Sequence, residues 1–445
     1  MSELPVLVIG AGPIGLAAAA RLAERGIPAL VLERGTIPGS AVAEWNHVRL
    51  FSRWGELIDP AARDLLASTG WAEPDADAYP TGADWATRYL QPLAEALGPD
   101  VVRTGTTVTA VTRQSRDRVV DSGRDTAPLV VHVTTSHGST ERILARAVID
   151  ASGTWHQPNP LGTEGIPAIG ETTARDRIHY RIPDLSDPAQ RAELLGKHIA
   201  LAGSGHSALT AIGILADLAA EDPTTTITWI LRRATSQPDI GAPDELPQRG
   251  ALGIRAREAV DAGLIHPRTG FRVTEIIDND QGLSLISDDG QRVDGVNTVL
   301  ALTGFRPDHR ITSEIRLDLD PVLEAPRALA PLIDPNVHSC GTVYPHGHAE
   351  LAHPEQGYFI AGMKSYGRAP TFLALTGYEQ VRSIVAAIDG DLAAAEAVEL
   401  TLPETGVCGG AGLFDDPDAA SSGGCCSAPA PPAELLALPT FGGRL

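Results

Sequence analysis

The chain is poor in cysteine, and its few cysteines are unevenly placed. Only four occur among 445 residues. Cys340 stands alone in the body of the chain, and the other three, Cys408, Cys425 and Cys426, lie near its C-terminal end. This distribution excludes the disulfide framework of a small secreted fold, so we expect reduced thiols in a cytoplasmic protein.

Basic charge and long apolar runs are also scarce. Lys and Arg number 35 against 56 Asp and Glu, which leaves a formal net charge of −21. This balance repels phosphate backbones and anionic lipids, so nucleic acids and membrane surfaces are poor candidate partners. No uncharged apolar run reaches the ~18 residues that span a bilayer, and the N-terminal stretch lacks the basic region of a signal peptide. A small-molecule partner is the better expectation.

The N-terminal stretch PVLVIGAGPIGLAAAARLAERGIPALVLER predicts a dinucleotide-binding βαβ unit. A strand from Val6 to Ile9 leads to a helix that ends near Arg25, and a second strand ends at Glu33, which can bind a ribose hydroxyl. We expect the adjacent Arg34 to bind the cofactor as well. Gly10 permits the tight turn, Gly12 lets the backbone approach a pyrophosphate, and Gly15 allows close helix packing. The alternative is a glycine turn without a ligand.

A second unit of this kind is predicted around GSGHSA. A strand from His198 to Ala202 is followed by Gly203 and Gly205, with Ala208 in the third position, and by a helix to about Ala220. The next strand ends in Arg232 and Arg233 where the first unit has an acid. An arginine pair can clamp a 2′-phosphate, which favours NADPH over NADH, although a solvated strand end is the alternative. Two units in one chain indicate one site for FAD and one for NADPH.

The predicted fold class is α/β, with two Rossmann-like dinucleotide-binding domains and an inserted antiparallel β-meander. The meander surrounds a polar loop from Gln114 to Pro128 and returns in an apolar strand towards Gly153. The stretch VNTVLALTGFRPD predicts a further strand, and a strand before GMKSYGRAP leads to a long helix after Pro370. We expect residues 1–160 and 301–400 to form the FAD-binding domain, 161–300 the NADPH-binding domain, and 401–445 a flexible tail.

Five stretches carry a family resemblance: GAGPIG, DASGTWHQPNP, GSGHSA, LTGFRPD and AGMKSYGRAPTF. Over about residues 1–400, the chain resembles the flavoproteins with two dinucleotide-binding domains, and among them the class B flavin-dependent monooxygenases. The resemblance implies that Gly153 and Gly304 lie at chain crossings near flavin or NADPH. It also implies that Gly362 through Ser365 pass beside the isoalloxazine and that backbone at Val108 meets the adenine.

Two departures from the family pattern concern the substrate and the flavin. The linker motif F-x-G-x-x-x-H is not intact, because His179 and Tyr180 follow Gly170 at a different spacing and no Phe precedes it. The substrate class therefore does not carry over from the well-known members. Lys364 stands where a Gly-Asp motif often contacts the ribityl chain. It could stabilise reduced, anionic flavin, or it could be a surface lysine.

The resemblance implies a reaction that needs few acid-base residues, so no catalytic residue is assigned. NADPH passes a hydride to FAD, oxygen adds to the reduced flavin at C4a, and the resulting hydroperoxide transfers one oxygen to a soft nucleophile. The stretch EWNHVRLFSRW is a candidate for shaping the site, through Trp45, Asn46, His47, Arg49 and Arg53. A packing-only role is the alternative for Trp45, Phe51, Trp54 and His47.

A histidine-rich stretch, HSCGTVYPHGHAELAHPE, is the one candidate for a metal site. It contains His338, Cys340, His346, His348 and His353. Their spacing matches no standard zinc pattern, so we predict no metal here and expect a loop that packs over the flavin or the active-site mouth.

The tail after Pro403 consists mainly of Gly, Ala, Ser, Pro and acidic residues, a composition that disfavours independent packing. Through the stretches WNHVRLFS, SCGTVYPHG, AGMKSYGRAPTFL, GYEQVRSI and LPETGVC, the chain is similar to flavin-binding monooxygenases of bacterial arsenic-resistance operons. Trivalent arsenic is soft and takes three thiolates, so Cys408, Cys425 and Cys426 could capture As(III) or an arsenic-thiol adduct. A redox-sensing pair and an incidental tail are the alternatives.

Three functions compete. The first is an NADPH- and FAD-dependent monooxygenase that acts on As(III) or another soft nucleophile with molecular oxygen. The second is an oxidoreductase like the pyridine nucleotide-disulfide reductases, which relays electrons from NADPH to a thiol or disulfide. Such enzymes need two cysteines beside the flavin, and residues 1–400 contain only Cys340. The third, a thiol-based arsenic or metal chaperone with a vestigial flavin fold, conflicts with two intact glycine motifs.

Overall fold

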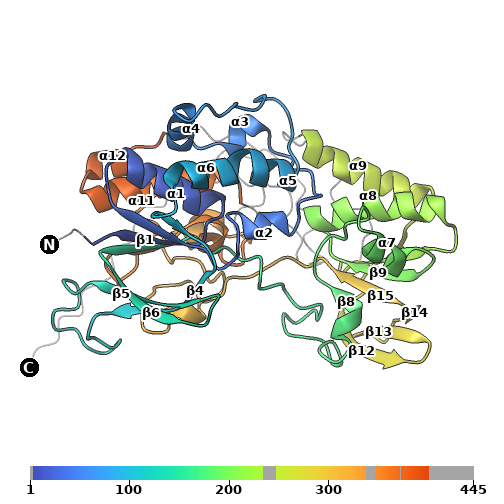
Figure 1. The fold of residues 1–445 in the computed structure, drawn as a ribbon. Helices are drawn as coiled ribbons and strands as arrows, with labels where there is room; N and C mark the ends of the chain where they lie inside the picture. The colour runs from blue at the N-terminus through green and yellow to red at the C-terminus, as the bar shows by residue number, and fades with distance from the viewer. Residues whose placement is uncertain (1–3, 234–246, 337–345, 371, 400–445) are drawn as a thin grey trace, which may run out of the picture.

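The computed structural model of the chain describes residues 4–233, 247–336, 346–370 and 372–399. Two parallel five-stranded sheets form its two lobes, which lie side by side (Figure 1). The first lobe also carries one three-stranded antiparallel sheet, and the second lobe carries another. This arrangement confirms the predicted α/β class with Rossmann-like parallel sheets and an inserted antiparallel meander.

The first parallel sheet has the order β16-β7-β1-β2-β3. Its strands are β1 (Val6–Ile9), β2 (Ala29–Leu32), β3 (Val102–Arg103), β7 (Ala147–Asp150) and β16 (Tyr358–Ile360). The central strands β1 and β7 are buried along their whole length, because helices pack on one face of the sheet and the antiparallel meander packs on the other. The meander that leaves and rejoins this lobe consists of β4 (Thr106–Arg113), β5 (Leu129–Thr135) and β6 (Thr140–Ala145).

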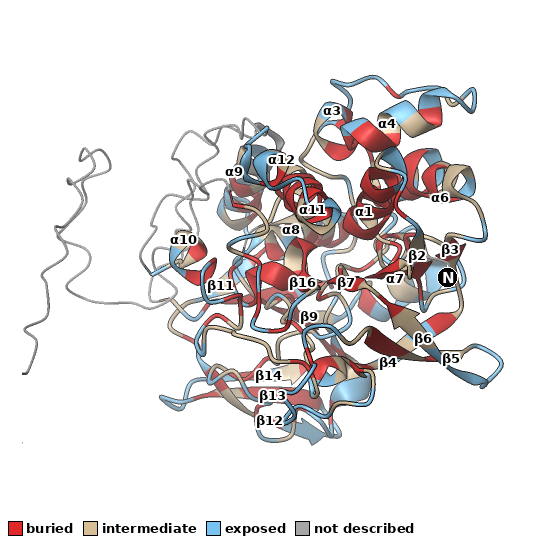
Figure 2. Ribbon diagram, turned by 90° about the vertical axis from the view of Figure 1, so that its left-hand side faces the viewer, coloured by how far each residue is buried: buried red, intermediate tan, exposed pale blue. Residues whose placement is uncertain are grey.

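The helices of the first lobe pack chiefly around α1 (Figure 1). Helix α1 (Pro13–Glu24) starts after the extended residue Gly12, with Pro13 in its first turn, and its alanine-rich face is fully buried (Figure 2). It packs against α11 (Ala374–Asp389) and α4 (Pro60–Ala67). The other helical segments of this lobe are α2 (Ser40–Ala43), α3 (Trp54–Leu57), α5 (Gly82–Trp85), a π-helical turn (Ala86–Leu90), α6 (Gln91–Leu97), α10 (Ala330–Ile333), α12 (Leu392–Glu396) and the 3₁₀ turns Arg310–Thr312 and Gly362–Tyr366.

The second parallel sheet has the order β11-β10-β9-β15-β8. Its strands are β8 (Ile178–His179), β9 (His198–Ala202), β10 (Thr226–Ile230), β11 (His266–Arg268) and β15 (Thr298–Ala301). Helices α7 (Pro188–Leu194), α8 (His206–Glu221) and α9 (Pro247–Asp261) belong to this lobe, as do the antiparallel strands β12 (Val273–Asn279), β13 (Gly282–Ser287) and β14 (Arg292–Val296). Strand β9 has the predicted bounds, whereas β10 ends at Ile230, so Arg232 and Arg233 follow the strand instead of ending it.

Two chain segments connect the lobes, and they run side by side. Pro158 and Phe305 form an isolated antiparallel bridge, and the Asn159 amide N–H donates to the Gly304 carbonyl at 2.9 Å. The Asn159 side chain bonds to both Thr303 and Arg306. The two crossings are therefore held to one another at the point where the lobes meet.

Among the residues that the structure describes, no helix is long and apolar enough to cross a membrane.

Candidate functional site

The first glycine motif forms an open cradle at the N-terminus of α1. Gly12 caps this helix without any side-chain hydrogen bond, and a Cβ built on Gly12 would meet no atom within 4 Å. Gly10 has a φ of +97°, which side-chain-bearing residues rarely adopt. A Cβ on Gly15 would lie 1.9 Å from the Gly10 carbonyl oxygen, so glycine is required there for helix packing. The helix N-terminus thus presents free space and positive potential to an anion.

Glu33 lies directly beneath this cradle. Its carboxylate is buried and accepts backbone N–H groups from Ala11 at 2.8 Å and from Gly35 at 2.7 Å. Arg34 beside it is exposed. Glu33 therefore orders the turn, and its predicted bond to a ribose hydroxyl stays a prediction.

A buried ion pair lies at the carboxyl edge of the first sheet. Lys364 donates to Asp150 at 2.7 Å and to Ser152 at 3.1 Å, and Tyr358 donates to the same Asp150 oxygen at 2.9 Å. Only 1% of the Lys364 side chain is exposed, so the alternative of a surface lysine is wrong. Burial alone would raise the pKa of Asp150, but Lys364 outweighs it and holds that pKa below the ordinary value.

The turn that leads from this edge to α11 is also buried. Gly362 has a φ of +73° and donates its N–H to the Gln380 side chain at 2.8 Å. Ser365 donates to the Gly362 carbonyl at 2.8 Å and is fully buried. A Cβ on Gly362 would crowd Ile14 of α1. Gly362 and Ser365 thus join α11 to the first cradle.

The second glycine motif forms a matching cradle at the N-terminus of α8. Gly205 caps the helix, and a Cβ on it would meet nothing within 4 Å. Gly203 has a φ of +131°, and a Cβ there would lie 2.3 Å from the Leu302 carbonyl oxygen. Ala208 is fully buried in the helix core. Beyond β10, Arg232 is exposed and Arg233 half-buried, and their clamp on a 2′-phosphate stays a prediction.

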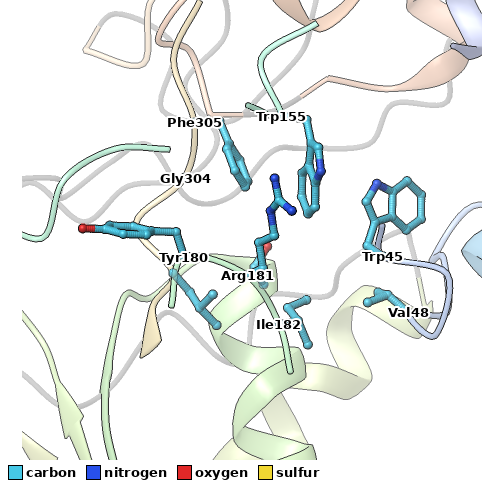
Figure 3. Close-up of a pocket in the computed structure, with 10 residues that line it drawn as sticks. Trp45, Val48, Trp155, Tyr180, Arg181, Ile182, Gly304 and Phe305 are labelled. Atoms are coloured by element: carbon cyan, nitrogen blue, oxygen red, sulfur yellow. The ribbon is translucent and has the colours of Figure 1, made fainter. Parts of the chain in front are cut away.

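A pocket of about 190 Å³ lies at the boundary between the two lobes, beside the start of α8 (Figure 3). Aromatic and aliphatic side chains dominate its wall, and Ser207 from the first turn of α8 and Gly304 complete it. The lining comprises Trp45, Val48, Trp155, Tyr180, Arg181, Ile182, Ser207, Leu302, Gly304 and Phe305. Trp155 and Phe305 pack against each other with ring centroids 4.9 Å apart and ring planes tilted by 35°. The wall combines residues of both lobes and both crossing segments, so the pocket exists only in the assembled molecule.

The sequence analysis overlooked two charged residues at this pocket. Glu44 accepts a hydrogen bond from the Trp155 indole at 3.0 Å and forms an ion pair with Arg181. The Arg181 guanidinium lies over the Trp155 ring, 4.7 Å from its centroid. Glu44 directly precedes Trp45 and Arg181 directly follows Tyr180, but no local pattern pairs residues so far apart in the chain.

The other predicted site residues occupy varied positions. Trp45 lines the pocket, and Trp54 is buried in the core, as the packing reading requires. His47 approaches Asp184 at 3.9 Å. Asn46 is exposed, and the Phe51 ring centroid lies 5.3 Å from that of His206. Arg49 donates to the Tyr79 carbonyl, and Arg53 donates to Asp77. Neither arginine lines the pocket. Val108 is half-buried on β4, and Gly153 follows β7 with a φ of +68°.

The histidine-rich stretch is only partly described. His338 and Cys340 lie outside the described residues, whereas His346 bonds to Gln380 of α11 at 2.9 Å and the His348 amide donates to Ser383 of the same helix. His353 accepts a hydrogen bond from the Asp318 amide at 3.3 Å. Within the described ranges, no group of three or more His, Cys, Asp or Glu could hold a metal ion.

All four cysteines lie outside the described residues. The part of the chain that forms both cradles and the pocket therefore contains no thiol. The predicted capture of As(III) by Cys408, Cys425 and Cys426 falls outside the described ranges as well.

The two cradles fit two dinucleotides. Each combines a helix N-terminus that has no side-chain cap with space where a Cβ would otherwise stand, and one dinucleotide phosphate group can accept the N–H groups of each helix start. Gly10, Gly12 and Glu33 would hold FAD, and Gly203, Gly205 and Ser207 would hold NADPH.

Comparison with known proteins places the chain among flavin enzymes. A family model described as pyridine nucleotide-disulphide oxidoreductase matches residues 7–325. Indole-3-pyruvate monooxygenase YUCCA1 of Oryza sativa subsp. japonica is 38% identical over 94 residues, which is 21% of each chain. Ketocytochalasin monooxygenase of Aspergillus clavatus is 25% identical over 219 residues, which is 48% of this chain and 31% of that protein. The chain thus matches less than a third of the length of either relative.

Solved structures share the fold over nearly their whole length. Bacillithiol disulfide reductase Bdr (YpdA) from Bacillus cereus superposes with a TM-score of 0.63 at 21% identity, covering 87% of this chain and 99% of that one. The cadaverine monooxygenase DfoA from Erwinia amylovora, bound to FAD, gives 0.60 at 15% identity, covering 91% and 99%. A flavin-containing monooxygenase from Stenotrophomonas maltophilia gives 0.53 at 20% identity, covering 88% and 99%.

Proposed function

The chain belongs to the pyridine nucleotide-disulphide oxidoreductase family and is a flavin-dependent oxidoreductase; from this premise we propose that it is an NADPH- and FAD-dependent monooxygenase. Its substrate is a soft nucleophile, and the substrate class that we favour is trivalent arsenic or an arsenic-thiol adduct. In the overall reaction, NADPH and one proton reduce dioxygen. One oxygen atom goes to the substrate and the other leaves as water, while NADP⁺ is released.

One observation carries the choice of monooxygenase over disulfide reductase. A disulfide reductase of this family needs a cysteine pair beside the flavin. Residues 1–400 of the sequence contain a single cysteine, Cys340, so they supply no such pair. The pocket at the boundary between the lobes has an aromatic wall. A wall of this kind excludes water from a small substrate, as oxygen transfer requires.

Bound FAD would accept hydride from NADPH and activate dioxygen. The chain's own residues have simpler tasks. The helix starts at Gly12 and Gly205 would bind pyrophosphates, and the Trp155–Phe305 pair supplies an apolar wall of the pocket. Lys364 and Asp150 neutralise one another at the carboxyl edge of the first sheet.

The arsenic assignment rests on the soft character of the tail thiols. Three of the four cysteines stand after Pro403, and As(III) prefers three thiolate ligands. Oxygen transfer would convert As(III) to As(V), a two-electron oxidation that the reaction above balances.

The experiment is an assay of NADPH oxidation and oxygen uptake by FAD-loaded protein in air, with and without arsenite or methylarsenite. A Cys408→Ser, Cys425→Ser, Cys426→Ser variant serves as the comparison, and Cys340→Ser as its matched control. We expect arsenic to stimulate oxygen uptake in the parent and in the Cys340 variant but not in the triple variant. NADPH-driven reduction of a disulfide without oxygen uptake would instead establish the reductase function.

A further inference from the structure

Glu44 is surrounded by donors at the boundary between the lobes. Its carboxylate pairs with the Arg181 guanidinium, accepts the Trp155 indole N–H at 3.0 Å, and lies 3.9 Å from the His156 ring. Glu44 follows α2 of the first lobe, whereas Arg181 follows β8 of the second. The Glu44–Arg181 pair is thus an ion pair between the two lobes.

Among the described residues, Arg181 is the only charged one in the lining of the pocket. Figure 3 shows its side chain among the aromatic residues of the wall, with the guanidinium beside Trp155. Ser207, in the first turn of α8, lines the same pocket of about 190 Å³, so the guanidinium and the second cradle are close neighbours.

A dinucleotide at the second cradle would bring negative charge to this arrangement. Ser207 of the first turn of α8 lines the same pocket as Arg181, so a phosphate group bound at the helix start would lie next to the guanidinium. NADPH carries several negative charges, which Glu44 repels and a guanidinium attracts, and arginine binds phosphate through two parallel N–H groups.

We propose that Arg181 exchanges partners when the dinucleotide binds, leaving Glu44 and donating to a phosphate group of NADPH or NADP⁺ at the start of α8. This inference rests on the proposed use of NADPH. Glu44 keeps the Trp155 indole as a donor after the exchange, so its carboxylate is not left without a hydrogen bond. Binding of the dinucleotide thereby breaks one ion pair between the lobes, which couples occupancy of the second cradle to the contact between them.

The proposal predicts that substitutions of Arg181 and Glu44 change the NADP⁺ affinity in opposite directions. Arg181→Gln removes the phosphate donor and should weaken NADP⁺ binding about tenfold or more. Glu44→Gln keeps an acceptor for Trp155 but frees the guanidinium and removes repulsion, so it should tighten NADP⁺ binding about threefold. The double variant should bind as weakly as Arg181→Gln alone, and Arg181→Lys should recover part of the loss.

Calorimetric titration of FAD-loaded protein with NADP⁺ measures these changes without turnover. The matched control is Arg177→Gln, which removes a similarly exposed ion pair with Asp278 at 3.2 Å in the same lobe, and its NADP⁺ affinity should equal that of the parent. If Glu44→Gln and Arg181→Gln weaken binding alike, the pair only holds the lobes together and the proposal is wrong.

The two proposals fail in distinguishable ways. A parent protein that binds NADP⁺ but consumes no oxygen with NADPH would refute the monooxygenase function and leave the partner exchange intact. A parent protein that shows oxygen uptake with unchanged affinity in both variants would refute the exchange alone. Absence of any NADP⁺ binding by the parent would refute both.

Discussion

At the scale of single residues, buried ion pairs hold together segments that lie far apart in the chain. Glu355 is 1% exposed and receives Arg113 at 2.6 Å and Arg124 at 2.7 Å. Burial alone would raise the pKa of Glu355, but hydrogen bonds from Arg124 and Arg113 hold it below the ordinary value. These bonds fasten the end of β4 and the loop after it to the segment before β16. Removing Glu355 would leave two buried arginines without their shared counter-ion.

His353 makes a pH dependence predictable. Burial, aided by nearby His309 and opposed by Asp318, lowers the pKa of His353 from 6.5 to about 4. The unfolded chain therefore binds more protons than the folded one between those values. The contribution of neutral His353 to the free energy of unfolding is fully present above about pH 6.5 and is lost as the pH falls towards 4. At pH 5 the loss should be about 2 kcal/mol.

His353→Gln removes this titration and should flatten the fall in melting temperature between about pH 7 and pH 5, as measured by calorimetry. His179→Gln, at a side chain that is 44% exposed, is the matched control and should follow the parent. A parent-like pH profile in the His353 variant would show that other groups govern acid stability.

At the scale of elements, the glycines that begin α1 and α8 are needed for ligand binding and not for folding. Gly12 and Gly205 have φ angles of −79° and −80°, which alanine adopts freely, and a Cβ on either meets no protein atom within 4 Å. Gly15 differs, because a Cβ there would overlap the Gly10 carbonyl oxygen at 1.9 Å. Alanine at the first two positions should therefore spare the fold and obstruct only the ligand.

We expect Gly12→Ala to lower the FAD content of the purified protein about tenfold or more, with the melting curve of the flavin-free protein unchanged. Gly205→Ala should retain FAD and weaken NADP⁺ binding to a similar extent. Flavin absorbance and calorimetric titration measure the two effects, and each variant is the control for the other. Loss of FAD from the Gly205 variant would contradict the assignment of the two cradles.

At the scale of the whole molecule, the second lobe is an insertion with paired ends. The strands of its two sheets all lie between residues 178 and 301. Its entry and exit are joined where the Asn159 amide donates to Gly304 and the Arg306 amide donates to Gln157, both at 2.9 Å. A unit with its ends held together and its own core is expected to fold alone.

A fragment of residues 157–306 should therefore unfold cooperatively and bind NADP⁺ but not FAD. Circular dichroism during heating and calorimetric titration test both points. Because the fragment lacks Glu44, its NADP⁺ affinity should match that of full-length Glu44→Gln, which is the control. A fragment without a cooperative transition would show that the first lobe is needed to fold the second.

Local patterns in the sequence were sufficient for the fold class and for the two glycine turns, but they did not predict the second antiparallel sheet, β12–β14. Apolar runs followed by glycines at fixed spacing predicted β1 and β9 with the observed bounds, because strand, tight turn and helix start depend on neighbouring residues. They did not predict the surroundings of Lys364 or Glu355. The partners Asp150 and Arg124 stand 214 and 231 residues away, and only folding brings them together.

The sequence by itself determined that this chain builds two dinucleotide cradles, since each cradle is made from one continuous stretch. Tertiary structure alone decided what lies at the boundary between the two lobes. The pocket wall joins residues from both lobes, and the indole of Trp155 meets Glu44 across 111 positions of sequence. A helix start depends on local backbone geometry, whereas an ion pair depends on how the lobes pack, and no periodicity in the chain encodes that distance.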